Sequence, residues 1–343
     1  MKVKGAYLAG VQNIEMRDRE LCLEADEVLV KTHLAGICGT DKNFYEGIFP
    51  RIDGLDTETR KDLAKPFFFG HEGGGTVVEA GHGVKSYRPG DKVISFAWID
   101  TFADHFKAKV SDLESVPDGL DMDLACLGEP IGCAVYSGLQ SNVQLGDTVA
   151  VFGMGFAGQI MAQVAKRKGA YRVIAVDVVD NKLNLARELG ADVVINAGRE
   201  DPVSVILEIT AGKGVDVAVE MAGTPAAVNQ CTASVRHNGT LVFYSWITQD
   251  VCLNISRWHN NSLQIINTGL VHHSLQERQL WTPLALRPVI QGQLNLKPLI
   301  THRFALDNIV EAFETARTDP AAIKVVLEPG TDRGGGVDIS GQV

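Results

Sequence analysis

The sequence predicts an α/β protein in which a β-rich domain is joined to a doubly wound parallel sheet. Up to about residue 120, short β-type segments are separated by glycine and proline, which is typical of a small barrel-like domain. From residue 147, apolar strands alternate with amphipathic helices, which is typical of a parallel sheet covered by helices. The length of 343 residues suits two domains better than one core.

The expected elements follow in chain order. The first part should hold strands at residues 26–38, 74–81 and 90–96, and helical spacing returns over 123–141. The alternating part should hold strands at 147–153, 171–178, 192–196, 215–223, 239–246 and 263–270, with helices at 156–170, 181–191 and 202–212. The last part should hold a helix at 275–292, a strand at 298–306, a helix at 307–317 and a strand at 322–329.

Because this last part leaves the alternating pattern, we expect it to return to the first domain. The expected domains are therefore 1–140 with 272–343, and 141–271 between them.

Composition excludes several classes of function. The net charge is −10 and no basic block is present, which argues against nucleic acid as a partner. No apolar run approaches the roughly 20 residues that span a bilayer, and the first residues do not resemble a signal peptide. The 6 cysteines are scattered, which does not suggest a disulfide framework and favours a cytoplasmic location.

A glycine motif marks a dinucleotide site. Gly153, Gly155 and Gly158 form G-x-G-x-x-G between an expected strand and helix, with Phe156 and Ala157 before the third glycine. Such glycines allow the turn, the approach of a pyrophosphate and close helix packing. Asp177 follows at the end of the next strand, where a carboxylate would bind both ribose hydroxyls and disfavour a 2′-phosphate. The motif therefore predicts NAD, with Lys182 also in reach of the adenosine ribose.

Thiol, imidazole and carboxylate side chains in glycine-rich settings indicate a metal. Cys38 lies in GICGTD, and His71 and Glu72 lie in GHEGGG. Glu129, in GEP, adds a second carboxylate. Each residue alone is more often structural, but together these donors suit zinc.

These motifs resemble the zinc-dependent medium-chain alcohol and polyol dehydrogenases, and the resemblance covers nearly the whole chain. It implies a GroES-like catalytic domain built from both chain ends around a central Rossmann domain. GHE and EP resemble the sorbitol, threonine and glucose dehydrogenase branch. The resemblance implies that Cys38 and His71 are zinc ligands, while Glu72 and Glu129 are candidates for the remaining positions, which water or substrate could fill instead.

The same resemblance assigns further roles. Thr40 would take the proton of the alcohol, while Asp41 either orients a ligand or caps a turn. The nicotinamide should lie near Ala222–Gly223 and Asn267–Leu270, which makes Ala222, Asn267 and Gly269 coenzyme residues. The substrate would be a polyol, sugar, cyclitol or hydroxy-amino acid, and the chain would form a homodimer or homotetramer.

Two departures from the family pattern matter. The region 91–110 lacks the 4 cysteines of a structural zinc lobe, so we expect one zinc per chain. Asn43 stands where many relatives place a proton-relay histidine.

Residues 48–66 form an enlarged charged segment that either shapes a pocket or is merely solvated. Four aromatic residues could either contact substrate or pack in the core: Trp98, Trp258, His259 and His272.

Two other functions stay open at this point. One is a zinc-free quinone or enoyl reductase of the same superfamily, and the other is a relative that binds nucleotide without catalysis. The presence of the Cys, His and Glu set argues against both.

Overall fold

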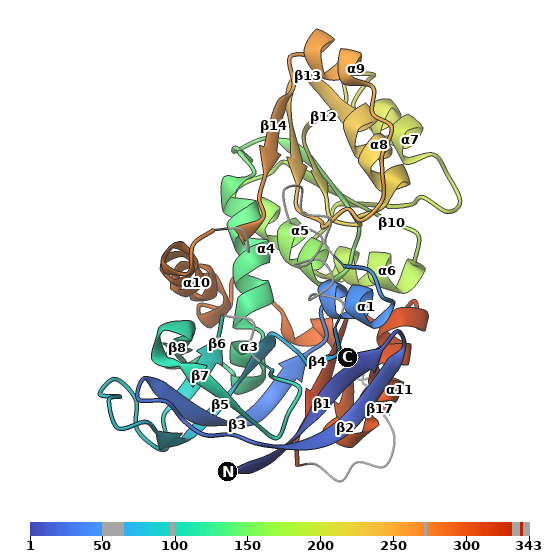
Figure 1. Ribbon diagram of the computed structural model, residues 1–343. Coiled ribbons are helices and arrows are strands. Elements are labelled where there is room, and N and C mark those ends of the chain that lie inside the picture. Colours follow the sequence, from blue (N-terminus) through green and yellow to red (C-terminus); the bar gives the residue numbers. More distant parts are fainter. Residues whose placement is uncertain (50–64, 97–99, 271–272, 331–336, 339–343) are drawn as a thin grey trace. The chain divides into compact units, whose positions relative to one another are not determined.

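The computed structural model describes residues 1–49, 65–96, 100–270, 273–330 and 337–338 (Figure 1). The chain divides into two compact units. Unit 1 holds Met1–Pro130 and Lys297–Val343, and unit 2 holds Ile131–Leu296. Among the described residues, no helix is long and apolar enough to cross a membrane.

Unit 1 is built on two sheets. The smaller sheet has the order β2-β1-β4, with β1 at Lys2–Gly10, β2 at Asn13–Glu20 and β4 at Phe67–Phe68. The larger sheet has the order β17-β15-β16-β3-β5-β6-β8, and β7 pairs with β3. Its strands are β3 (Glu27–Gly36), β5 (Glu72–Ala80), β6 (Lys92–Ser95), β7 (His105–Lys109), β8 (Leu113–Ser115), β15 (Ile300–Ala305), β16 (Lys324–Glu328) and β17 (Val337–Asp338).

Both ends of the chain meet in the larger sheet. C-terminal β16 pairs antiparallel with N-terminal β3, with Val326 opposite Gly36. This pairing brings the residue after β3 close to residues at the start of β16. The last segment of the chain thus contributes β15, β16 and β17 to this sheet.

The glycines of β5 are required by close strand packing. A Cβ at Gly75 would lie 1.9 Å from the carbonyl oxygen of Lys31 on β3, and one at Gly74 would lie 2.6 Å from that of Val93 on β6. Any larger residue would push these backbones apart. The glycines therefore fix the start of β5 deep in the sheet.

The helices in the described part of unit 1 are short. They are α1 (Gly39–Tyr45), α3 (Met122–Cys126) and α11 (Ile309–Thr318), with 3₁₀ turns at Val110–Asp112, Lys297–Leu299 and Leu306–Asn308. Tyr45 at the end of α1 packs on Phe313 of α11, with ring centroids 5.2 Å apart. Phe69 and Phe102 also contact Phe313. This aromatic cluster holds α1 against α11.

Unit 2 is a parallel six-stranded sheet with the order β11-β10-β9-β12-β13-β14. Its strands are β9 (Thr148–Phe152), β10 (Arg172–Asp177), β11 (Val193–Asn196), β12 (Val215–Glu220), β13 (Val235–Phe243) and β14 (Gln264–Asn267). Its helices are α4 (Gly128–Gln140, beginning in unit 1), α5 (Phe156–Arg167), α6 (Asp180–Glu188), α7 (Pro202–Ile209), α8 (Pro225–Ser234), α9 (Ile255–Asn260) and α10 (Leu275–Ile290).

The strand order reverses between β9 and β12. Consecutive strands run outward from β9 in one direction and from β12 in the other, so a crevice is expected outside their carboxyl ends. The strands are covered on both faces, as buried clusters that include Val149 and Ala150 show. The predicted combination of a β-rich domain and a doubly wound sheet is confirmed.

Some elements differ from the expectation. The helix expected over 123–141 is two helices, because the chain breaks at Leu127, and Pro130 lies in the first turn of α4, where its missing N–H is harmless. Helices α1, α8 and α9 were not expected. In the division by packing, α10 and the part of α4 after Pro130 belong to unit 2. The domain boundaries expected from the sequence, at 140/141 and 271/272, stay a prediction.

Candidate metal centre and coenzyme site

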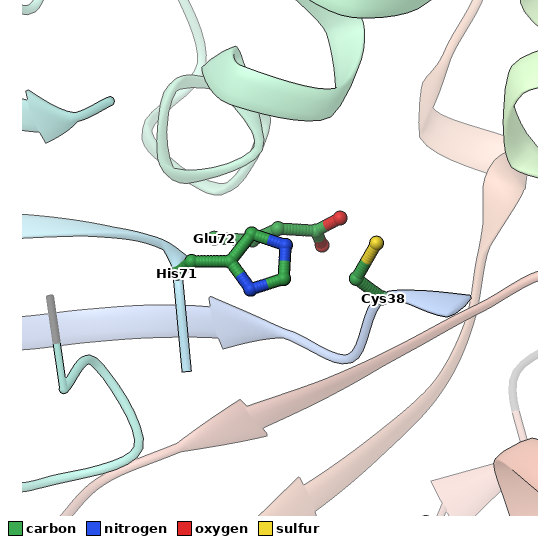
Figure 2. Close-up of side chains that lie close together, drawn as sticks. All are labelled: Cys38, His71 and Glu72. Carbon is green, nitrogen blue, oxygen red and sulfur yellow. The ribbon is translucent and has the colours of Figure 1, made fainter. Parts of the chain in front are cut away.

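Three potential metal ligands converge in unit 1. Ligand atoms of Cys38, His71 and Glu72 all lie within 4.8 Å of one another. Figure 2 shows the sulfur and the carboxylate pointing to the same space as the imidazole. Cys38 is partly exposed, His71 is buried and Glu72 is 0% exposed. The β3–β5 pairing, which places Gly36 opposite Glu72, brings the two segments together.

Asp41 joins the two loops that carry the thiol and the imidazole. Its Oδ2 accepts a hydrogen bond of 2.9 Å from the Cys38 N–H, and its Oδ1 lies 3.1 Å from His71 Nδ1. Asp41 is 0% exposed. A carboxylate on Nδ1 fixes the orientation of the ring and leaves Nε2 for another partner.

The electrostatics of His71 reflect these neighbours. Burial alone would lower its pKa, but the Asp41 carboxylate and the Cys38 sulfur both raise it. The pKa of His71 is therefore held well above its ordinary value. A cation bound to the ring would replace the proton that this negative environment attracts.

Glu72 is held by a lysine from the other end of the chain. Lys324 Nζ donates to both carboxylate oxygens of Glu72, at 2.7 and 3.0 Å, and to the carbonyl of Ile37 at 3.4 Å. Burial lowers the pKa of Lys324, but the charge of Glu72 prevails and raises it. A Cβ at Gly36 would lie 2.3 Å from Glu72 Oε2, so glycine provides the space for this carboxylate.

Other expected site residues take different places. Among the described residues, the ligand cluster does not include Glu129, which lies in the first turn of α4. Thr40 and Asn43 are partly exposed on α1, two and five residues after Cys38. Their expected roles, and that of Glu129, stay predictions.

The glycine motif forms the turn between β9 and α5. Gly153 has a φ of +100°, which only glycine adopts readily. A Cβ at Gly158 would lie 1.8 Å from the carbonyl oxygen of Gly153, whereas one at Gly155 would meet nothing within 4 Å. Phe156 and Ala157 begin α5, whose N-cap is Gly155. The turn therefore leaves open space at Gly155 and close packing at Gly158, as a pyrophosphate site requires.

Asp177 ends β10 beside this turn. Its Oδ2 accepts from Met154 N–H at 2.6 Å, and its Oδ1 accepts from the N–H groups of Val178 and Val179. These bonds place the carboxylate at the carboxyl edge of the sheet. Lys182 follows on α6, where its carbonyl accepts from Gln159 Nε2 at 2.8 Å.

The turn after β12 is fixed by a buried glutamate. Glu220 Oε1 accepts from Ala222 N–H at 2.8 Å and from Gly223 N–H at 2.7 Å. Burial raises the pKa of Glu220, which is 0% exposed. A Cβ at Gly153 would lie 2.8 Å from the nitrogen of Ala222, so the turn after β12 packs directly on the glycine turn. By fixing the turn after β12, Glu220 also supports this packing.

Asn267 and Gly269 border a cavity of about 310 Å³ in unit 2. Trp258 also lines this cavity and packs on Phe243, with centroids 6.4 Å apart. His259 is exposed. Trp98, His272 and most of the 48–66 segment lie outside the described residues.

Sequence reasoning missed Lys324 and Glu220. Each was visible as a charged residue inside an apolar strand, in AIKVVLE and VDVAVEM. A buried charge requires a partner or a shifted pKa, so such residues deserved notice.

Comparisons with known proteins agree with this geometry. Residues 24–174 match the family described as alcohol dehydrogenase GroES-like domain, and residues 157–284 match zinc-binding dehydrogenase. An L-threonine 3-dehydrogenase of Bacillus licheniformis is 30% identical over 336 residues, covering 90% of this chain and 92% of the relative. Sorbitol dehydrogenase of Mus musculus is 28% identical and covers 89% and 90%.

A solved structure is also similar. The 2R,3R-butanediol dehydrogenase of Bacillus subtilis superposes with a TM-score of 0.80 at 25% identity, covering 95% of this chain and 99% of that one. The chain belongs to the zinc-dependent medium-chain dehydrogenase family. It is an oxidoreductase of the zinc-containing dehydrogenases, which act on CH–OH groups. These comparisons support neither the zinc-free reductase nor the non-catalytic alternative.

Proposed function

We propose that this chain oxidises a secondary alcohol of a polyol, sugar, cyclitol or hydroxy-amino acid with NAD and one zinc ion, or catalyses the reverse reduction. One observation carries the proposal: the convergence of Cys38, His71 and Glu72 within 4.8 Å, in a chain whose other unit carries the glycine turn. The relatives named for threonine, sorbitol and butanediol support this substrate class, because each of those compounds has a secondary alcohol.

The donor set fits zinc. A thiolate, an imidazole and a carboxylate are its usual protein ligands, and three protein ligands leave a position open in catalytic sites. Cys38 and His71 would hold the ion, and Glu72 would join them when it leaves Lys324. Glu129 stays a proposal for a further ligand. When bound, zinc polarises the substrate oxygen and lowers the pKa of the alcohol.

The protein groups around the ion then have distinct tasks. Asp41 holds the His71 ring and the backbone at Cys38 in place, through the contacts at both of its oxygens. The Thr40 hydroxyl, two residues after Cys38, would accept the alcohol proton. Asn43 cannot titrate, so a proton leaving Thr40 would pass to water rather than to a side chain at this position.

Coenzyme binding is assigned to unit 2. The pyrophosphate would lie on the open face of Gly155 at the start of α5, and Asp177 with Lys182 would bind the adenosine ribose. Ala222, Asn267 and Gly269 would contact the nicotinamide half. The Asp177 carboxylate supports a preference for NAD, since its charge repels a 2′-phosphate.

We propose a single zinc per chain, because no cysteine occurs between residues 91 and 110. We also propose a cytoplasmic homodimer or homotetramer. All six cysteines are free, which suits a reducing compartment. Strand β14 is an outer strand of the parallel sheet in the described part of unit 2, and such an edge can pair with a second copy.

A substrate screen tests this function. The purified zinc-loaded protein is mixed with NAD and a panel of polyols, sugars, cyclitols and hydroxy-amino acids, and NADH absorbance is followed. We expect NADH formation with at least one secondary alcohol and loss of the rate after chelation of zinc. Turnover that is unaffected by complete zinc removal would refute the proposal.

A further inference from the structure

Two turns lie against each other at the edge of the sheet where the adenosine is expected. The first turn follows β10 after Asp177, and the second follows β11 after Asn196. Asn196 at the end of β11 is the register partner of Asp177 at the end of β10. The N–H of Ala197 donates to the carbonyl of Asp177 at 2.9 Å. A Cβ at Gly198 would lie 3.9 Å from the Cβ of Val178. Residues 196–199 therefore border the carboxylate that is expected to choose the coenzyme.

This second turn carries an arginine that is already engaged. Arg199 Nη2 donates to Asp180 Oδ2, while Asp180 Oδ1 accepts from Asn196 Nδ2 at 2.7 Å. The N–H of Arg199 donates to the carbonyl of Asn196 at 2.9 Å, which fixes the backbone of the turn. Both oxygens of Asp180 are thus occupied, and the side chain of Arg199 is 71% exposed.

We propose that Asp180 is a second determinant of coenzyme choice, which acts by engaging Arg199 and so denies a 2′-phosphate its arginine. The inference rests on the proposed coenzyme site at Asp177. An arginine close to this position is what accommodates the 2′-phosphate of NADP in such folds, because its guanidinium matches phosphate geometry. The chain thus holds both an acid that favours NAD and a cation that could favour NADP.

The charge of Asp180 determines whether Arg199 is available to bind the 2′-phosphate of NADP. In the native chain, the guanidinium of Arg199 is neutralised, and Asp177 with Asp180 makes the edge unfavourable for another negative group. Replacing Asp180 by asparagine keeps its size and an acceptor for Arg199, but it removes the charge that holds the guanidinium. Arg199 can then turn to a phosphate instead.

The test measures dissociation constants for NADH and NADPH by coenzyme fluorescence. Asp180→Asn should tighten NADPH binding about three- to fivefold, the upper range for one exposed charge pair, and should change NADH binding less than about twofold. The double variant Asp180→Asn with Arg199→Ala should return to the native NADPH affinity. Glu188→Gln, at the other end of α6, removes the same charge and should leave both affinities unchanged.

The outcomes separate two claims. The inference on Asp180 is overturned if Asp180→Asn gives no gain, if the gain survives in the double variant, or if Glu188→Gln gives the same gain. Native protein that binds NADPH as tightly as NADH would instead overturn the proposed preference for NAD. NADH affinity in each variant serves as the control for an intact fold.

Discussion

Asp41 shows how much of the metal centre depends on one residue that need not touch the metal. It contacts the backbone of Cys38 and the ring of His71 at once. Because these residues come from separate segments, the distance between thiol and imidazole depends on this carboxylate. A carboxylate 3.1 Å from Nδ1 favours a proton on that nitrogen, which would leave Nε2 as the ligand atom.

Replacing Asp41 by asparagine tests this role. The amide keeps the size but loses the charge, so the His71 ring is held less firmly. We expect zinc affinity to fall about 10- to 100-fold, with turnover falling in parallel and NADH affinity preserved. Zinc affinity is measured by competition with a chelator. An unchanged zinc affinity would show that Asp41 serves only as a cap of α1.

The sequence singled out Cys38, His71 and Glu72 as potential ligands and Asp41 as a residue that could orient one of them, but it did not reveal Lys324. Cys38, His71 and Glu72 stood out because glycine-rich settings are poor places for core residues. Lys324 did not, because its partner Glu72 lies 252 residues away and only the β16–β3 pairing joins them. Asp177 was placed correctly at a strand end, but its bonds to Met154, Val178 and Val179 depend on turn geometry that spacing does not reveal.

At the level of elements, the glycine turn and α5 form one packed unit. The third glycine of the motif, Gly158, allows close packing of the helix on the turn, whereas the second, Gly155, leaves open space for a ligand. Gly158 has no room for a Cβ, whereas Gly155 has open space. Replacing each glycine by alanine should therefore distinguish an effect on stability, at Gly158, from an effect on coenzyme affinity, at Gly155.

Gly158→Ala should destabilise unit 2, since its Cβ would lie 1.8 Å from the Gly153 carbonyl oxygen. We expect a loss of about 1–3 kcal/mol in the free energy of unfolding. Gly155→Ala should leave that free energy nearly unchanged but weaken NADH binding about tenfold or more, because the methyl group occupies the path of the pyrophosphate. Chemical denaturation and NADH titration measure both. Equal effects of the two substitutions on stability would contradict this division.

A second element-level feature is an ion network that ties α3 to the larger sheet of unit 1. Asp123 on α3 bonds to His33 on β3 and to Arg303 on β15, each at 2.7 Å. The hydrogen bond from His33 lowers the pKa of Asp123, burial opposes this, and Arg303 lowers it further, to about 2. A carboxyl with a lowered folded pKa stabilises the fold above its unfolded pKa and loses that effect as pH falls.

The free energy of unfolding should therefore fall as pH drops from about 4 towards 2, and the Asp123→Asn variant should lack this part of the slope. Denaturation of both proteins at pH 5, 4 and 3 measures it. Asp18→Asn serves as the matched control, because the Asp18–Lys2 pair is exposed on both sides. Parallel pH slopes for native and Asp123→Asn protein would refute the assignment.

The fold class could be predicted because period-2 and period-3.6 patterns are strong over long segments of unit 2. Short elements could not: α1 covers only Gly39–Tyr45 and is held by packing of Tyr45 on Phe313, a contact between distant parts of the sequence. Local patterns thus predicted the architecture and the motifs, while long-range pairing determined how the site is held.

At the scale of the whole molecule, the chain combines a thiol–imidazole–carboxylate cluster in unit 1 with a glycine-rich turn at the start of α5 in unit 2. Each unit has its own sheet or sheets and its own buried core. Metal binding and coenzyme binding should therefore be separable by mutation. The central claim is that Cys38 holds the zinc on which turnover depends.

The most direct test is the zinc content of native protein and of Cys38→Ser, measured per chain by elemental analysis, together with turnover and NADH affinity. We predict one zinc in the native chain, and loss of zinc and of turnover in Cys38→Ser with NADH affinity within about threefold of native. Cys22→Ser, at an exposed cysteine, should behave like the native protein. A Cys38→Ser protein that keeps its zinc and turns over at the native rate would contradict the account.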